Sequence, residues 1–377
     1  MAATHATESQ PFLLGHSAAR RALATALRGG HLHHAWILHG PVGVGKMRAA
    51  QALARIVLDP TATAANMDAL EPPTGTPVAA LIQAGTHPDY HVICKELAAV
   101  SESRELRERK QLNIPLDLLR ERMLGGVDGE GRHHESAVFR TAAMGHGKVF
   151  VVDEAELLDP DAQNAMLKTL EEPPANTTMV LVTSREDRLL PTVRSRCQRV
   201  AFGPLDAAAM AAWWERSGVE VPADERAFVD AFAEGAPGMV QRAVQFGLAG
   251  WHKELSPLLD QLESGAYPPM LADRLGELVE GVAKTVVDQD EHASKDAANR
   301  LGTRLLARML GLRVRAALKA AADDAHALAR ALAAQDVLAD FEFQVRSNVN
   351  LKHALSNLVA QWGARTAARG EHAGRGR

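Results

Sequence analysis

Cysteine is scarce in this sequence. Only Cys94 and Cys197 occur among 377 residues, and they lie far apart. Two distant cysteines cannot form a disulfide framework or a four-cysteine zinc site. We therefore expect a protein of the reducing cytoplasm that carries no structural zinc.

Long apolar runs and an excess of basic charge are also missing. No run approaches the roughly 20 apolar residues that cross a membrane. The first residues, MAATHATESQPF, have neither a basic start nor an apolar stretch, which a signal peptide would need. We expect neither secretion nor a membrane anchor. The net charge of -4 argues against a surface that coats nucleic acid, so any DNA contact is expected to be shared or indirect.

The chain otherwise has the composition of an ordinary globular protein, with 46% hydrophobic and 23% charged residues. Its first half alternates apolar runs typical of strands with helical periods, which predicts an α/β domain with a parallel sheet. Strands are expected at the run HAWILH, at 149–152 and in TTMVLVTS. Polar residues that follow such strands face the crevice where parallel sheets bind ligands.

The segment HGPVGVGKM lies between the first strand and a helical period. This context favours a phosphate-binding loop, whose backbone N–H groups and lysine form an anion cradle. A Ser or Thr that ligates Mg²⁺ normally follows the lysine, but this chain has Met47 there. The alternative is a glycine turn that binds nothing.

Two further strand ends complete the candidate nucleotide site. Asp153 and Glu154 follow the second strand, where phosphate-loop enzymes place a metal-holding Asp and a water-orienting Glu. Thr183 ends the third strand. The alternative is a purely structural role, in which these polar residues cap the turns that follow the strands. The candidate nucleotide-binding residues are Gly40, Gly43, Gly45, Lys46, Met47, Asp153, Glu154 and Thr183.

Arginines gather in LLPTVRSRCQRV, shortly after the third strand. A helix with surface arginines is one interpretation, which we accept for Arg194 and Arg199. The other is an arginine finger, a guanidinium offered to a neighbouring subunit's nucleotide. A helix is also expected within LLDPDAQNAMLKTLEEPP, from its N-cap Asp159 to the two prolines that stop it. Its Lys168 and Glu171 are candidates for a subunit contact, although a solvated face is the default for such charges.

The histidine-rich run HLHHAWILH carries His31, His33, His34 and His39. Because no partner carboxylate or thiolate is evident, we prefer a loop that leads into a strand to a metal site.

Composition divides the chain into an α/β domain at 1–203, a helical lid at 204–265, a larger helical domain at 266–365 and a disordered tail at 366–377. Residues 59–147 form a long, poorly patterned insertion. Since structureless loops of that length are rare, we expect a strand at 90–93 and a helix around 115–124 within it. Its charged run SESRELRERKQ is a solvated helix face or a mobile tip.

Taken together, these segments resemble the AAA+ clamp-loader family of bacterial DNA polymerase III, in particular its delta-prime branch. The resemblance runs in order through LLGHSAARRALATAL, HLHHAWILHGPVGVGK, HPDYHVI, KVFVVDEAELLDPDAQNAMLKTLEEPP, LLPTVRSRCQ, GAPG and NVNLKHALSNLVAQW. The TLEEPP-type helix and the SRC triplet are quite specific to clamp loaders.

The resemblance implies an AAA+ module of α/β domain and lid, followed by a helical collar that assembles a heteropentamer with the gamma/tau and delta subunits. It implies action on the sliding clamp and primer-template DNA, and a role for Arg196 as an arginine finger in trans. Met47, the Met239 that stands where motor subunits carry a sensor arginine, and the absence of zinc-module cysteines depart from the motor pattern.

The first two departures favour a non-motor, stator-like subunit with little or no ATPase of its own, and the third leaves the insertion without the zinc module usual in the family. Its loop is then either a relic or a passive site for ATP or ADP with Mg²⁺. The alternatives are an ATP-hydrolysing motor subunit, another AAA+ remodeller, and a pure scaffold in which Arg196 is idle.

Overall fold

The structure, a computed structural model, describes residues 13–29, 32–321, 324–347 and 349–367. Contacts divide the chain into two units, one of Met1–Glu220 with Ala233–Met239 and one of Val221–Phe232 with Val240–Arg377. The predicted lid at 204–265 is thus shared between two units, and its boundaries stay a prediction, as do those of the collar. Most of the tail, from residue 368 onward, lies outside the described residues, whereas the buried Thr366 belongs to the last helix.

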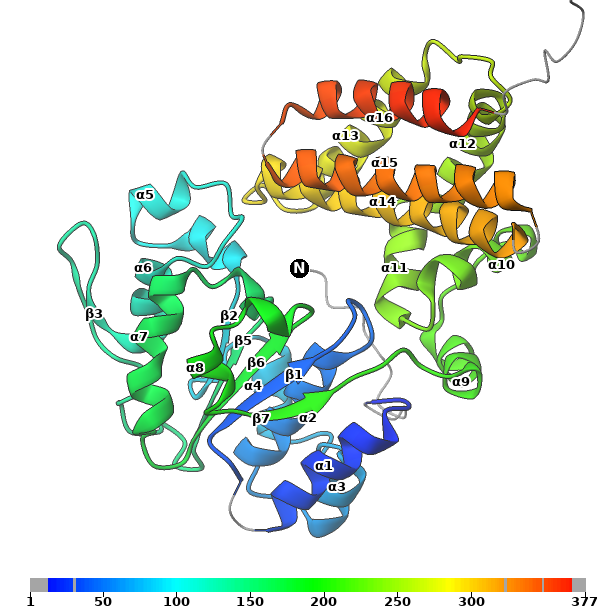
Figure 1. Ribbon diagram of the computed structural model, residues 1–377. Coiled ribbons are helices and arrows are strands. Elements are labelled where there is room, and N and C mark those ends of the chain that lie inside the picture. Colours follow the sequence, from blue (N-terminus) through cyan, green and yellow to red (C-terminus); the bar gives the residue numbers. More distant parts are fainter. Residues whose placement is uncertain (1–12, 30–31, 322–323, 348, 368–377) are drawn as a thin grey trace, which may run out of the picture. The chain divides into compact units, whose positions relative to one another are not determined.

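The first unit is built on a five-stranded parallel sheet, which confirms the predicted α/β class (Figure 1). The order across the sheet is β2 (Tyr90–Ile93), β5 (Lys148–Val152), β6 (Thr177–Thr183), β1 (Ala35–His39) and β7 (Gln198–Ala201). All neighbouring strands pair in parallel. The three strand ends predicted to meet, those of β5, β6 and β1, are therefore neighbours.

Strand β7 corrects the prediction for the arginine-rich segment. Only Pro191–Arg194 form a helix (α8), and the chain then enters the sheet beside β1, with Gln198 opposite Trp36 and Ala201 opposite His39. The segment is too short and too polar for alternation to reveal a strand. Its pairing with β1 is a tertiary effect.

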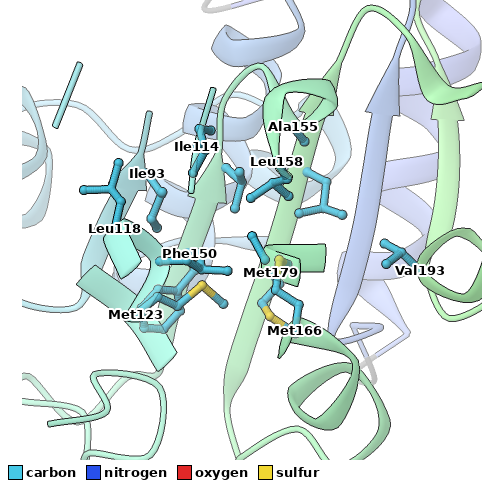
Figure 2. Close-up of a cluster of buried hydrophobic side chains, with 14 of the residues drawn as sticks. Ile93, Ile114, Leu118, Met123, Phe150, Ala155, Leu158, Met166, Met179 and Val193 are labelled. Carbon is cyan, nitrogen blue, oxygen red and sulfur yellow. The ribbon is translucent and has the colours of Figure 1, made fainter. Parts of the chain in front are cut away.

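Helices cover both faces of the sheet. On one face, Phe150, Met179 and Ile93 pack against Met166 of α7 and Met123 of the insertion (Figure 2). On the other face, α2 contacts β1, β5 and β6. The helical elements of this unit outside the insertion are α1 (Ser17–Arg28), α2 (Lys46–Leu58), η3 (Ala155–Leu157), α7 (Pro160–Glu171), η4 (Glu186–Arg188), α8 and α9 (Ala207–Ser217). Helices α3 (Ala64–Ala69) and α4 (Pro77–Gln83) lie at the start of the insertion.

The insertion is folded onto the sheet rather than loose. The expected strand is β2, and the expected helix appears as α6 (Leu116–Leu119) continued by η2 (Arg120–Leu124). The charged run forms a short helix whose Leu106 is 2% exposed in the core while its charges face solvent, which confirms the solvated helix face. The other elements are η1 (Lys95–Val100), α5 (Arg104–Arg107), β3 (Gly126–Val127) and β4 (His133–His134).

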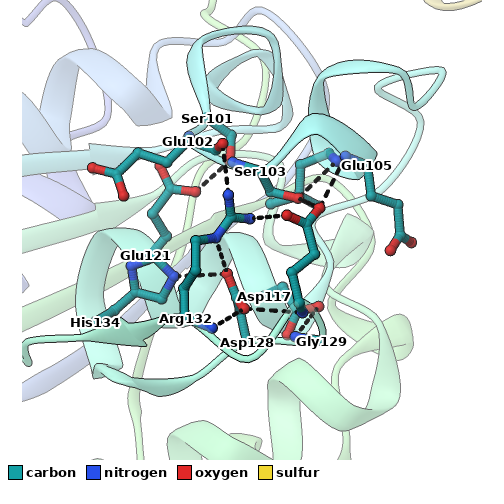
Figure 3. A network of polar contacts seen from close by, with 12 residues as sticks. Ser101, Glu102, Ser103, Glu105, Asp117, Glu121, Asp128, Gly129, Arg132 and His134 are labelled. Carbon is teal, nitrogen blue, oxygen red and sulfur yellow. Dashed lines mark hydrogen bonds and ion pairs between the residues drawn. The ribbon is translucent and has the colours of Figure 1, made fainter.

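A polar network ties the β3–β4 hairpin to α5 (Figure 3). Asp128 accepts hydrogen bonds from His134 Nε2 at 2.9 Å and from Arg132 Nε at 2.9 Å. These donors, His134 first, hold the pKa of the Asp128 carboxyl well below its usual range. Ser103 at the start of α5 donates to Glu130 at 2.7 Å. The hairpin is therefore fixed by side chains as well as by its two-residue ladder.

From Asp206 onward the described residues contain helices and no strands, as predicted. In the second unit, α13 packs on α14 and α16, α14 on α15, and α15 on α16. Glu263 of α12 joins two of these helices, because it accepts hydrogen bonds from Arg313 Nε at 2.9 Å and from Trp362 Nε1 at 3.0 Å. The remaining bounds are α10 (Ala223–Ala233), α11 (Pro237–Gln245), α12 (Leu248–Glu263), α13 (Leu271–Gln289), α14 (Lys295–Ala320), α15 (Ala325–Arg346) and α16 (Leu351–Thr366).

Candidate functional site

The phosphate loop connects the end of β1 to the start of α2, as predicted. Gly40 has φ of 142°, and a Cβ there would lie 1.9 Å from the carbonyl oxygen of Phe202, so this position requires glycine. Gly43 has φ of 82°, and its carbonyl accepts the Gly238 N–H at 2.8 Å. The loop is thus held from both sides, by the end of β7 and by the segment at 236–239.

Lys46 occupies the loop that it closes. It is 6% exposed, and its Nζ donates to the carbonyl oxygens of Gly40 and Pro41, each at 2.6 Å. Burial lowers the pKa of Lys46 to about 8, against the opposing influence of Glu156 and Asp153. A nucleotide phosphate would have to replace these two carbonyl contacts.

Met47, Asp153 and Glu154 stand at the positions predicted to handle metal and water. Met47 is half-buried in the first turn of α2 and offers no hydroxyl. Burial raises the pKa of the Asp153 carboxyl at the end of β5. Glu154, in the left-handed region at φ 48°, is ion-paired with Lys95, so the carboxylate expected to orient water has a cation of its own.

Thr183 and Glu156 complete this edge of the sheet. Thr183 is 1% exposed, and its hydroxyl oxygen accepts the Arg185 N–H at 3.0 Å. Its carbonyl accepts the Gly40 N–H at 3.3 Å, which fixes the start of the loop. Glu156 accepts the backbone N–H and hydroxyl of Ser184. The structure therefore brings all the predicted strand-end residues to one edge, with Thr183 in a supporting position.

Met239 lies directly against the loop. It is 4% exposed, and a Cβ on Gly43 would come within 3.2 Å of its Cγ. An apolar side chain thus packs on the loop at the sequence position where the resemblance predicts a sensor arginine in motor subunits.

Arg196 lies at the amino end of the parallel strands, whereas the phosphate loop follows the carboxyl end of β1. It precedes β7, whose first residue, Gln198, pairs with Trp36, four residues before Gly40. At 3.3 Å per strand residue this places Gln198 about 13 Å from the loop along the strand direction. Arg196 is two residues further away along the chain.

Each arginine of this segment has a distinct setting. Arg196 Nη1 donates to the Thr192 carbonyl at 2.9 Å, and its Nη2 is ion-paired with Glu171, the last residue of α7. Arg199 is paired at 2.9 Å with Glu186, consistent with a surface role. Arg194 lines a surface pocket of about 880 Å³ beside β7.

The histidine-rich run leads into β1, as predicted. His34 Nε2 lies 2.9 Å from the Leu170 carbonyl oxygen, and His33 Nδ1 lies 2.8 Å from that of Ala35. His31 lies outside the described residues. Within the described ranges no three His, Cys, Asp or Glu side chains are grouped as metal ligands would be, nor is any helix there long and apolar enough to cross a membrane.

Comparison with known proteins identifies the family. The sequence model of the family described as DNA polymerase III, delta subunit, matches residues 15–206. The chain belongs to this family. A DNA polymerase III subunit delta' from Pseudomonas aeruginosa is 28% identical over 360 residues, which are 91% of this chain and 96% of the relative.

Two further relatives match shorter stretches. Escherichia coli subunit delta' is 31% identical over 57% of this chain and 56% of its own length. Mycobacterium tuberculosis subunit gamma/tau is 27% identical over 50% of this chain and 28% of its own length. The expected resemblance to delta-prime subunits is confirmed.

The sequence did not single out Lys95 or Tyr90, and it did not predict that Glu171 pairs with Arg196. Lys95 pairs with Glu154 and Glu171 pairs with Arg196, while the buried Tyr90 hydroxyl, near Asp153, has no hydrogen-bond partner among the described residues. Lys95 and Tyr90 have no local signal. Glu171 lies in the TLEEPP segment quoted for the resemblance, which was the available clue.

Proposed function

We propose that this chain is a non-motor, stator-like subunit of the DNA polymerase III clamp loader and supplies Arg196 as an arginine finger in trans. The position of Arg196 is the observation that most supports this. Its segment starts about 13 Å or more from the chain's own phosphate loop along the strands. Since the side chain also turns toward α7, Arg196 is suited to a nucleotide held by a neighbouring chain.

The chain's own loop fits a passive or relic nucleotide site. A bound nucleotide would meet the Gly40–Lys46 loop, with Asp153 and Thr183 beyond it, and Mg²⁺ would find Asp153 but no hydroxyl at Met47. The ion pair between Glu154 and Lys95 leaves no ready carboxylate for water. Little or no hydrolysis follows from this arrangement.

The partners we propose are the gamma/tau motor subunits and the delta subunit, in a cytoplasmic heteropentamer that acts on the sliding clamp and primer-template DNA. Names of the relatives support this assignment, since they include both delta' and gamma/tau subunits. With a net charge of -4, we expect this chain to reach DNA mainly through the complex.

A motor subunit is the second candidate, favoured only by the intact glycines and lysine of the loop.

Reconstitution of the complex separates the stator role from the motor role. The purified chain is mixed with gamma/tau and delta subunits, and clamp loading on primed DNA is measured with and without it. We expect loading to require the chain even when its own Lys46 is changed to Ala; loss of loading in Lys46→Ala, with the complex still assembled, would favour the motor role.

A further inference from the structure

Two segments distant in sequence meet at one ion pair. Glu171 is the last residue of α7, and Arg196 lies between α8 and β7. The Arg196 Nη2 contacts the Glu171 carboxylate, while Nη1 donates to the Thr192 carbonyl at 2.9 Å and lies 3.5 Å from the Ser195 hydroxyl. Both terminal nitrogens of the guanidinium are thus engaged within the chain.

An engaged guanidinium cannot serve a neighbour's phosphate at full strength. The Glu171 carboxylate neutralises the charge that a finger must offer to the transferring phosphoryl group. Geometry adds to this, because the N–H that donates to Glu171 is not available to a ligand in another chain, and the contact fixes the direction of the guanidinium. Arg196 must therefore leave Glu171 before it acts.

The position of Glu171 is unfavourable without the arginine. A carboxylate in the last turn of a helix lies at the negative end of the helix dipole, and Glu172 adds a second carboxylate at the C-cap. Lys168 is the one basic residue within the last turn of α7. A nearby cation such as the Arg196 guanidinium therefore stabilises the Glu171 carboxylate.

We infer that Glu171 restrains the finger, holding Arg196 in a resting position until the nucleotide of a neighbouring subunit takes the place of the carboxylate. This rests on the proposed function of Arg196. The side chains of Arg196 and Glu171 are 35% and 49% exposed. Ion pairs this exposed are weak and readily exchanged, so the contact is able to hold the finger in the idle complex and still yield to a phosphate.

The test uses Glu171→Gln in the reconstituted complex, with the matched control Glu172→Gln, which removes the same charge one residue away. ATPase is measured without clamp and DNA, and again with both. We expect Glu171→Gln to raise the unstimulated rate about 1.5- to fivefold, the range of an exposed ion pair, and to leave the stimulated rate nearly unchanged. Glu172→Gln should change neither rate.

A third variant separates this inference from the proposed function. Glu171→Gln combined with Arg196→Ala should match Arg196→Ala alone, because the carboxylate acts only through the arginine. If Arg196→Ala lowers the stimulated rate but Glu171→Gln leaves the unstimulated rate at or below that of the wild type, the restraint is wrong and the finger stands. If Arg196→Ala changes nothing, the proposed function fails as well. Thermal unfolding of the isolated variants confirms that each is folded.

Discussion

The Nζ of Lys46 lies 2.6 Å from the carbonyl oxygen of Gly40, at the base of the loop that this lysine closes. With the matching contact to Pro41, the amine satisfies carbonyl groups of its own loop. A loop that binds its own lysine is stable without a ligand. This contact, together with Met47 and Met239, is the structural basis on which we propose a passive loop.

Lys46 should make stability depend on pH. Burial lowers its pKa to about 8 in the folded chain, against about 10.4 when unfolded. Between these values the unfolded state binds more protons, so the free energy of unfolding rises with pH. Relative to Lys46→Met, the wild type should gain up to about 2 kcal/mol between about pH 7 and about pH 9.5 in urea unfolding. A difference that does not vary with pH would contradict this.

The isolated chain should hydrolyse ATP at a negligible rate. A metal held without a hydroxyl at Met47, and a γ-phosphate without a sensor arginine at Met239, are poorly stabilised in the transition state. Binding of nucleotide is compatible with this. Steady-state turnover of the purified chain is the measurement. Several turnovers per minute that disappear in Lys46→Ala would instead establish a motor.

Contact between the loop and the segment at 236–239 should contribute to stability. A Cβ on Gly238 would come within 2.9 Å of Gly43 Cα and 3.1 Å of its carbonyl oxygen. We expect Gly238→Ala to lower the free energy of unfolding by about 1–3 kcal/mol. In Gly250→Ala, the control in helix α12, the added Cβ meets no heavy atom within 4 Å, so a gain of about 0.4–1 kcal/mol is expected. If both variants changed the free energy of unfolding equally, the contact between Gly238 and Gly43 would be too loose to matter for stability.

Purified chain should contain no stoichiometric zinc. Cys94 directly follows β2, and Cys197 directly precedes β7. Burial raises the pKa of the two thiols to about 11 and about 12 respectively. Half-buried thiols with pKa values raised in this way resist the deprotonation that zinc binding requires. Elemental analysis after dialysis against a weak chelator is the measurement, and one equivalent of retained zinc would show a ligand set that includes residues we have not considered.

Much of the fold could be predicted from local patterns. Strands β1, β5 and β6 are apolar runs followed by polar residues, and the cap Asp159 and Pro160 fix the start of α7. Strand β7 could not be predicted, because its four residues carry two exposed polar side chains and are stabilised by pairing with β1. Local sequence does not encode such pairing.

Part of the candidate site could likewise be predicted from the sequence, and part of it could not. The loop residues and the strand ends follow from motif and topology, since parallel strands bring their carboxyl ends together. The ion pairs of Glu154 with Lys95 and of Arg196 with Glu171 join residues 59 and 25 positions apart. Only the folded chain reveals that these carboxylates and cations are already matched.

Arg196→Ala in the reconstituted clamp loader is the decisive test of the proposed arginine finger. An arginine finger is typically worth about 10³–10⁵ in rate at the site that it serves, or roughly 4–7 kcal/mol. Because other motor sites would keep their own fingers, bulk ATPase should fall partially and clamp loading more severely. Arg196→Lys should rescue poorly, since an ammonium lacks the planar fork.

The control is Arg199→Ala, whose side chain is paired with Glu186 and whose removal should be mild. We expect the Arg196→Ala variant to enter the complex normally, yet to depress both the ATPase stimulated by DNA and clamp and the loading of the clamp. Unchanged loading and unchanged ATPase in that fully assembled complex would contradict this expectation and reduce this chain to a scaffold.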